Sequence, residues 1–95
     1  MTINNAGEFY NFIRDNQLIG LSPEVSSVML CMEEYGKMCA CDPPQDKIAK
    51  QNQCRALYVT FVVKSHQYKD DLFKKNRETE IVFTVNGQQL VTLTR

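Results

Sequence analysis

The four cysteines and the single histidine are the residues of this sequence best suited to hold a metal ion. Cys39 and Cys41 form one close pair, while Cys31, Cys54 and His66 stand apart from it. A structural zinc ion needs four converging ligands, which often come from two close pairs. Because only one close pair is present, and its spacing is not the common one, we expect no metal site and no cofactor.

The same residues are poorly arranged for nucleophilic catalysis, which needs a cysteine within hydrogen-bond reach of a histidine. On a continuous helix, His66 would lie about 18 Å from Cys54. The acidic pairs Glu33–Glu34 and Asp70–Asp71 are typical of solvated helix faces, because adjacent residues on a helix do not face each other. The glycines are isolated and form no phosphate-binding loop. We therefore expect no catalytic residues, and a protein that is not an enzyme.

A stretch of basic and aromatic residues between positions 64 and 77 has a pattern that can bind single-stranded nucleic acid. The candidate residues are Lys64, Tyr68, Lys69, Lys74, Lys75 and Arg77. Acidic residues in and beside this stretch dilute its charge, and the whole chain carries 11 basic and 11 acidic residues. Because nucleic-acid-binding domains are usually basic, we prefer a solvated helix end and keep nucleic-acid binding as the alternative function.

Helix signals are clear in the first half of the chain. Asn5 and Glu8 have the spacing of a capping box and predict a short helix over about 6–16. Pro23, preceded by a serine, predicts the start of a second helix over about 23–40. Apolar residues recur in this second segment at helical spacing, so one of its faces is expected to pack on the core.

A third helix is expected over about 44–75, because Asp42–Pro43–Pro44 ends the second helix and Pro44 can open the next one at its first position. The two helices then form an antiparallel hairpin in which Cys31 lies opposite Cys54. Residues 56–64 are ambiguous, because their apolar spacing is helical while their β-branched and aromatic residues favour a strand. We prefer the helix, since one continuous helix needs fewer boundaries. The alternative is a three-stranded sheet with helices on one face.

A β-hairpin is expected over about 80–94, around the typical turn sequence Asn86–Gly87. The sequence does not decide how the residues of its two strands pair. A two-residue turn pairs Phe83 with Leu90, whereas a three-residue loop places Val82 and Leu90 together on the second face. Apolar residues occupy both faces in either register. The sequence therefore predicts a single α+β domain that covers the whole chain.

The compartment is inferred from segments that the sequence lacks. No apolar run approaches the roughly 18 residues that span a bilayer, and the first residues lack the basic stretch and apolar core of a signal peptide. We therefore expect no membrane contact and no secretion by a signal peptide, with a location in the cytoplasm or within a viral particle. Because the default compartment is reducing, the cysteines are expected to be free thiols.

Residues 57–63 are almost all apolar, and a helix that is apolar all round must be covered all round. The other predicted elements give little cover. Acidic residues are in excess over 1–43 and basic residues over 44–95, which suits contacts between copies. We therefore expect a non-catalytic structural or adaptor subunit of a larger assembly, such as a virus particle, that binds other protein subunits or copies of itself. The expected contact residues are Val59, Val63, Val82 and Leu90.

Overall fold

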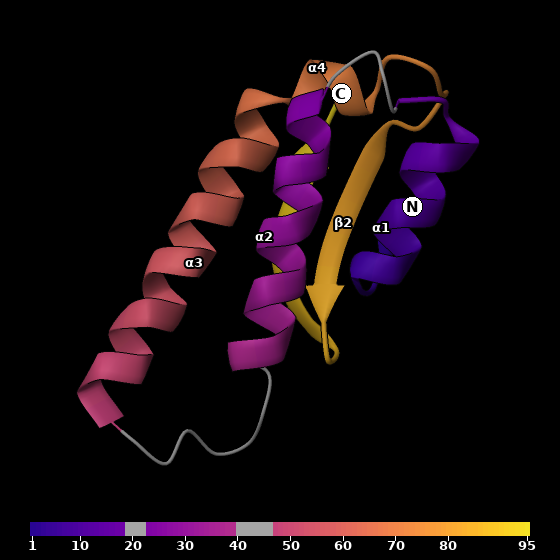
Figure 1. Ribbon diagram of the computed structural model, residues 1–95. Coiled ribbons are helices and arrows are strands. Elements are labelled where there is room, and N and C mark those ends of the chain that lie inside the picture. Colours follow the sequence, from indigo (N-terminus) through magenta and orange to yellow (C-terminus); the bar gives the residue numbers. More distant parts are fainter. Residues whose placement is uncertain (19–22, 40–46) are drawn as a thin grey trace.

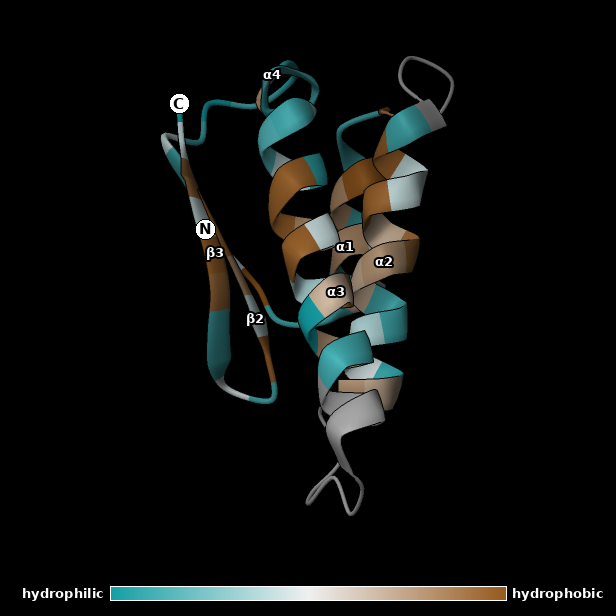
Figure 2. Cartoon of the chain, turned by 90° about the vertical axis from the view of Figure 1, so that its left-hand side faces the viewer, coloured by the Kyte–Doolittle hydropathy of each residue, from teal (hydrophilic) through white to brown (hydrophobic). Residues whose placement is uncertain are grey.

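The computed structural model describes residues 1–18, 23–39 and 47–95 of the chain. It confirms the α+β class: the described helices lie on one face of a three-stranded sheet (Figure 1). Figure 2 shows the same two layers from the side, with the sheet apart from the helices. In chain order the elements are β1 (Thr2–Ile3), α1 (Ala6–Asp15), α2 (Pro23–Cys39), α3 (Lys47–Gln67), α4 (Lys69–Leu72), β2 (Glu80–Val85) and β3 (Gln88–Thr94).

Helix α1 begins where the sequence predicts and ends one residue before the predicted end. The Asn5 side chain accepts a hydrogen bond from the Glu8 amide at 2.8 Å, which satisfies an amide that the helix start leaves unpaired. The Glu8 carboxylate in turn accepts a bond from the Asn4 amide at 3.1 Å. The buried residues of α1 are Phe9, Phe12 and Ile13.

Helices α2 and α3 form the predicted antiparallel hairpin, and residues 56–64 are helical. Their register differs from the expected one. Cys54 is disulfide-bonded to Cys39, with Cα atoms 5.6 Å apart, so the expected pairing of Cys54 with Cys31 is wrong. Because α3 begins at Lys47 and not at 44, a longer connection separates the helices. The facing positions on α2 therefore shift toward the C-terminal end of that helix, by about two helical turns at Cys54.

The disulfide also corrects the expectation of free thiols for Cys39 and Cys54. A reducing compartment disfavours disulfides in general, but two cysteines that face each other across paired helices have the geometry to form one. Cys31 remains a free, half-buried thiol, and its Sγ donates to the Leu57 carbonyl at 3.6 Å. Cys41 lies outside the described residues.

The third predicted helix is interrupted near its end. Helix α3 stops at Gln67, and α4 ends at Leu72 and not at about 75. The Asn76 side chain donates to the Leu72 carbonyl at 2.7 Å and so satisfies one of the carbonyls that a helix end leaves unpaired. Leu72 and Phe73 are both buried in the core. The chain therefore leaves the helix earlier than its pattern predicts, at the point where these two side chains enter the core.

The sheet has the strand order β1–β2–β3 and includes one strand that the sequence did not predict. Strand β1 runs parallel to β2, with Thr2 beside Val82 and Ile3 beside Phe83. Two residues are too few to show the alternation by which a strand is recognised. The strand is held by the burial of Ile3 and by a hydrogen bond from the Val82 amide to the Met1 carbonyl at 2.9 Å.

The β2–β3 hairpin combines the two registers that the sequence left open. Next to the two-residue turn at Asn86–Gly87, Thr84 pairs with Gln89. Farther from the turn, Phe83 pairs with Val91, which is the register of a three-residue loop. The turn residues have φ values of 50° and 79°, as the favoured two-residue hairpin turn requires.

Leu90 is the extra residue of the β-bulge that joins these two registers. It is only 4% exposed and belongs to the core. The expectation that Leu90 shares the outer face of the hairpin with Val82 is therefore wrong. Strict alternation would place it there, but a bulge lets two consecutive residues of β3 point to the same side. Val82 is half-buried on the outer face.

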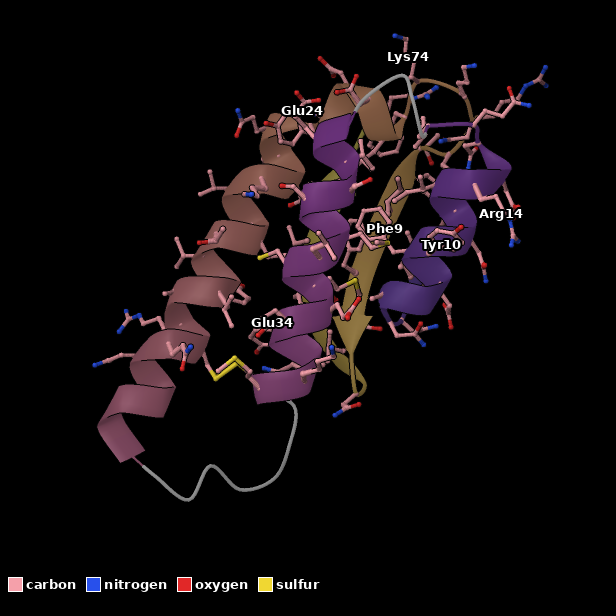
Figure 3. All side chains as sticks on the ribbon, in the orientation of Figure 1. Phe9, Tyr10, Arg14, Glu24, Glu34 and Lys74 are labelled. Atoms are coloured by element: carbon pink, nitrogen blue, oxygen red, sulfur yellow. A yellow bond between two sulfur atoms is a disulfide. The ribbon has the colours of Figure 1, made fainter. Side chains whose placement is uncertain are left out.

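The core lies between the sheet and the helices, and Phe83 of β2 packs against aromatic rings from two of the helices. Its ring centroid is 5.0 Å from that of Phe9 in α1 and 5.2 Å from that of Phe61 in α3. All three side chains are fully buried. Aromatic pairs at these distances stabilise a core beyond the area that they bury. Figure 3 shows Phe9 pointing from α1 toward the sheet.

Candidate protein-interaction surface

The residues considered for metal binding and catalysis do not converge. Among the described residues, no group of three or more histidine, cysteine or acidic side chains could hold a metal ion. His66 is exposed, and its Nδ1 lies 2.9 Å from the Val62 carbonyl on the same helix. Cys54 is held in its disulfide with Cys39. The structure therefore does not pair Cys54 with His66.

Cys31 is the free thiol of the described chain. Burial raises the pKa of the Cys31 thiol, and the nearby ammonium group of Lys64 offsets part of this rise. A raised pKa keeps the thiol protonated at neutral pH, whereas the thiolate is the nucleophilic form. Cys31 is therefore suited to its hydrogen bond with the Leu57 carbonyl and not to nucleophilic attack.

Three aliphatic side chains on α2 and α3 are more than half exposed. Leu30 is 57% exposed, Val59 is 51% exposed and Val63 is 57% exposed. We call these three residues the outer helical surface. Val59 and Val63 are one helical turn apart and therefore lie on the same face of α3. The sequence predicted these two valines as contact residues but did not predict Leu30.

Leu30 stands at the same level of the helical hairpin as the two valines. Lys64 of α3 donates to the Ser27 hydroxyl of α2 at 2.7 Å, and Cys31 of α2 donates to the Leu57 carbonyl of α3. Leu30 lies between Ser27 and Cys31, so it is level with the part of α3 between Leu57 and Lys64. Figure 2 shows the hydrophobic stretches of α2 and α3 at the same height on the two helices.

The inner face of α3 explains why the two valines remain outside. Phe61 and Ser65 are fully buried, and they mark the side of the helix that packs on the core. Val59 and Val63 each lie two residues from Phe61, which places them on the opposite side. Among the described residues, the apolar stretch of α3 is thus covered on the side of Phe61 and exposed at Val59 and Val63.

Two uncharged segments form this part of the helical hairpin, residues 25–32 in α2 and 56–63 in α3. Acidic residues flank the first segment and basic residues flank the second. The flanking residues are Glu24, Glu33, Arg55 and Lys64. An uncharged centre with a polar rim is typical of protein–protein interfaces.

Leu30 was missed because it does not belong to the apolar stripe of its helix. The stripe packs on the core through Val25, Val28 and Met32, which are buried. Leu30 lies on the other side of α2 among polar residues. An apolar residue that breaks the polar face of an amphipathic helix was the signal that could have identified it.

The outer face of the sheet is mostly polar, contrary to the expectation of a second apolar face. Val82 is half-buried there, and its neighbours on this face are Glu80, Thr84, Thr92 and Thr94. The Thr84 hydroxyl donates to the Asn4 side chain at 2.7 Å. With Leu90 in the core, Val82 is the one contact candidate of the hairpin that remains on a surface.

The nucleic-acid candidates do not form a stacking site. Lys64 is bonded to Ser27, and Tyr68 is half-buried and packs against the core. Phe73 is buried as well, so no aromatic ring between positions 64 and 77 is exposed for stacking with a base. Lys69 is half-buried, and the exposed cations of this stretch are Lys74, Lys75 and Arg77.

Two open hollows lie elsewhere on the described chain. The larger, of about 480 Å³, lies between the start of α1, helix α2 and the hairpin turn. Its charged lining residues, Glu33 and Lys37, form an ion pair at 3.0 Å. The smaller, of about 220 Å³, lies between β1 and α1. Neither hollow is lined by a cysteine or a histidine.

Comparisons of this chain with protein-family models, with curated proteins and with solved structures gave no match. In the part of the chain that the structure describes, no helix combines the length and the apolar character needed to cross a bilayer. Function is therefore inferred from the surfaces of the chain itself, of which the outer helical surface has the clearest chemistry.

Proposed function

We propose that the chain is a non-catalytic structural or adaptor subunit, and that it binds another protein subunit or a second copy of itself through the outer helical surface. The observation that carries this proposal is the exposure of Leu30, Val59 and Val63 at one level of two paired helices. Apolar groups that cluster on a surface and are rimmed by polar residues mark sites of protein interaction.

The rigidity of the helical hairpin supports the proposal. Helices α2 and α3 are joined by one covalent bond and by two side-chain hydrogen bonds. These are the disulfide Cys39–Cys54, the bond from Lys64 to Ser27 and the bond from Cys31 to Leu57. A surface that is formed before binding loses less conformational entropy when a partner docks. The outer helical surface is pre-formed in this sense.

The charges around the surface favour a protein partner with a matching arrangement. The rim is acidic on α2 through Glu24, while Glu33 is paired with Lys37 on its own helix. On α3 the rim is basic through Arg55 and Lys64. Opposite charges across an interface guide association and fix its orientation. A second copy can present its basic helix to the acidic helix of the first, and another subunit can present the same pattern.

The proposal is tested with a double variant, Val59→Lys with Val63→Lys, measured against the unchanged chain. Tyr10→Lys is the matched control, because Tyr10 is 47% exposed on α1 and lies away from the outer helical surface (Figure 3). Sedimentation measurements over a range of concentrations give the association constant, and circular dichroism checks the fold. We expect the double variant to weaken association at least about tenfold, since each lysine must be desolvated at the interface.

If the partner is a different protein, the same three chains are compared in the purified native complex. We expect the complex to be lost in the double variant and kept in Tyr10→Lys. Equal association of all three chains would refute the proposal. So would a mass that stays near 11.0 kDa at every concentration for a chain that co-purifies with no other protein.

A further inference from the structure

The disulfide between Cys39 and Cys54 occupies a distinctive place in the fold. Cys39 is the last residue of α2, and Cys54 lies in the first half of α3. Both residues are half-buried, so the bond lies at the surface and not in the core. Figure 1 shows the first turns of α3 extending past the end of α2 and past the β2–β3 turn.

Cys54 also links the first part of α3 to α2. From Asn52 to Ala56, every described side chain except that of Cys54 is exposed. The first fully buried side chain described in α3 is Phe61. Between Cys54 and Phe61, the Leu57 carbonyl accepts a hydrogen bond from Cys31, and the Tyr58 ring lies 6.4 Å from the Tyr35 ring. In the described residues from 52 to 56, the disulfide is therefore a covalent link between α3 and the end of α2.

The sequence of this segment gives it little stability of its own. Residues 47–56 are mostly polar and amide side chains. A helix of about ten residues is marginal in water unless it packs on other elements or is held by a cross-link. Of the described side chains in this segment, only that of Cys54 is half-buried, and its bond to Cys39 is a cross-link to α2.

We propose that the disulfide Cys39–Cys54 is a reducible latch that sets the order of residues 47–56. The reductant is a protein or small-molecule dithiol. One of its thiolates attacks a sulfur of the disulfide and forms a mixed disulfide, and its second thiol then displaces the protein sulfur. Two electrons and two protons pass to Cys39 and Cys54, which become thiols, and the dithiol is oxidised to its own disulfide.

Reduction leaves the rest of the fold in place. The buried side chains that form the core include Phe61 in α3 but none of the described residues from 52 to 56. Once the S–S bond is broken, residues 47–56 lose their cross-link while residues from Phe61 onward keep their contacts with the sheet. The latch and the proposed function share this disulfide, which is one of the links that hold α2 to α3. The three residues of the outer helical surface, Leu30, Val59 and Val63, nevertheless lie outside the released segment, so each proposal is tested by its own measurement.

The test is amide hydrogen exchange of the full chain, oxidised and after reduction by dithiothreitol under native conditions. We expect residues 47–56 to exchange at least about tenfold faster in the reduced chain, as local opening without global unfolding requires. Residues 61–67 and strand β2 should exchange at the same rate in both forms. The double variant Cys39→Ser with Cys54→Ser should match the reduced chain whether or not dithiothreitol is present.

Two matched variants test whether the effect comes from the bond between Cys39 and Cys54. Cys31→Ser and Cys41→Ser should each keep the difference between the oxidised and reduced chains. Equal exchange of residues 47–56 in both forms would overturn the latch, as would a disulfide that resists dithiothreitol until the chain unfolds. Loss of protection throughout the reduced chain would show that the disulfide stabilises the whole fold, and this result would also overturn the latch. Loss of the effect in Cys41→Ser would show that another cysteine pair carries it, which also overturns the proposal.

Discussion

The hydroxyl of Tyr58 in α3 donates a hydrogen bond to the carbonyl of Leu90 in β3 at 3.1 Å. Leu90 is the extra residue of the β-bulge and has no directly opposite partner on β2. A bulge disrupts the local ladder of backbone hydrogen bonds, and a partly buried carbonyl without a donor is costly. Tyr58 therefore bonds from a helix to a carbonyl at the point where the ladder is disrupted.

The first prediction follows from this bond. Tyr58→Phe removes the hydroxyl and keeps the ring, so we expect the free energy of unfolding to fall by about 1 kcal/mol. Urea unfolding measures the change. The matched control is Tyr10→Phe, since Tyr10 is an exposed tyrosine on α1, and we expect its stability to change by less than about 0.5 kcal/mol. Equal losses for the two variants would argue against a role for the bond at Leu90.

The second prediction separates the two hairpin residues that the sequence placed on one face. Leu90 is 4% exposed in the core, so Leu90→Ala should lower the free energy of unfolding by about 2–4 kcal/mol through lost burial and a cavity. Val82 lies on the polar outer face, so Val82→Thr should change it by less than about 0.5 kcal/mol. Thermal or urea unfolding of both variants gives the comparison. A larger loss for Val82→Thr would mean that the hairpin has no bulge at Leu90.

Local patterns were sufficient for the helices and for part of the candidate surface. A helix was preferred for residues 56–64 because one continuous helix needs fewer boundaries, and the structure confirms a helix there. Val59 and Val63 were selected as contact residues because the other predicted elements cannot cover every side of a helix that is apolar all round. The Asn5 cap and the Asn86–Gly87 turn were also readable, since each depends on a few neighbouring residues.

The features that were missed depend on contacts between distant residues. The β-bulge places Leu90 in the core, where its carbonyl meets Tyr58 of α3, a residue 32 positions away in the sequence. The disulfide of Cys39 with Cys54 depends on the register of two helices, which the prolines at 43 and 44 did not determine. Strand β1 depends on its pairing with β2, almost the whole length of the chain away. No local pattern contains this information.

The third prediction concerns the glycine inside α2. A methyl group added at Gly36 would lie 3.9 Å from the nearest Val85 side-chain atom, which is an ordinary contact distance. The glycine is therefore not required for a close approach between elements. Because alanine favours a helix more than glycine does, Gly36→Ala should raise the free energy of unfolding by about 0.5–1 kcal/mol.

The control for this prediction is the glycine of the hairpin turn. Gly87 has a φ of 79°, which side-chain-bearing residues adopt only with strain, so Gly87→Ala should lower stability by about 1 kcal/mol. Chemical denaturation of the two variants measures both changes. A loss of stability in Gly36→Ala would show that α2 lies closer to the hairpin than the structure places it.

The last prediction concerns the reactivity of the Cys31 thiol. Burial raises its pKa, and Lys64 offsets part of the rise, so less thiolate is present at a given pH than in a free cysteine. In the oxidised Cys41→Ser chain, where Cys31 is the remaining thiol, alkylation by iodoacetamide at pH 7 should be slower than that of a free cysteine. Lys64→Gln removes the charge that lowers the pKa, so it should move the pH dependence further upward. The raised pKa of Cys31 also makes the stability of the fold depend on pH. The stabilising contribution of the protonated thiol is complete below the pKa of the unfolded chain and is lost as the pH rises toward the folded value. Alkylation of Cys31 at pH 7 faster than that of a free cysteine would contradict the burial that the structure gives this thiol.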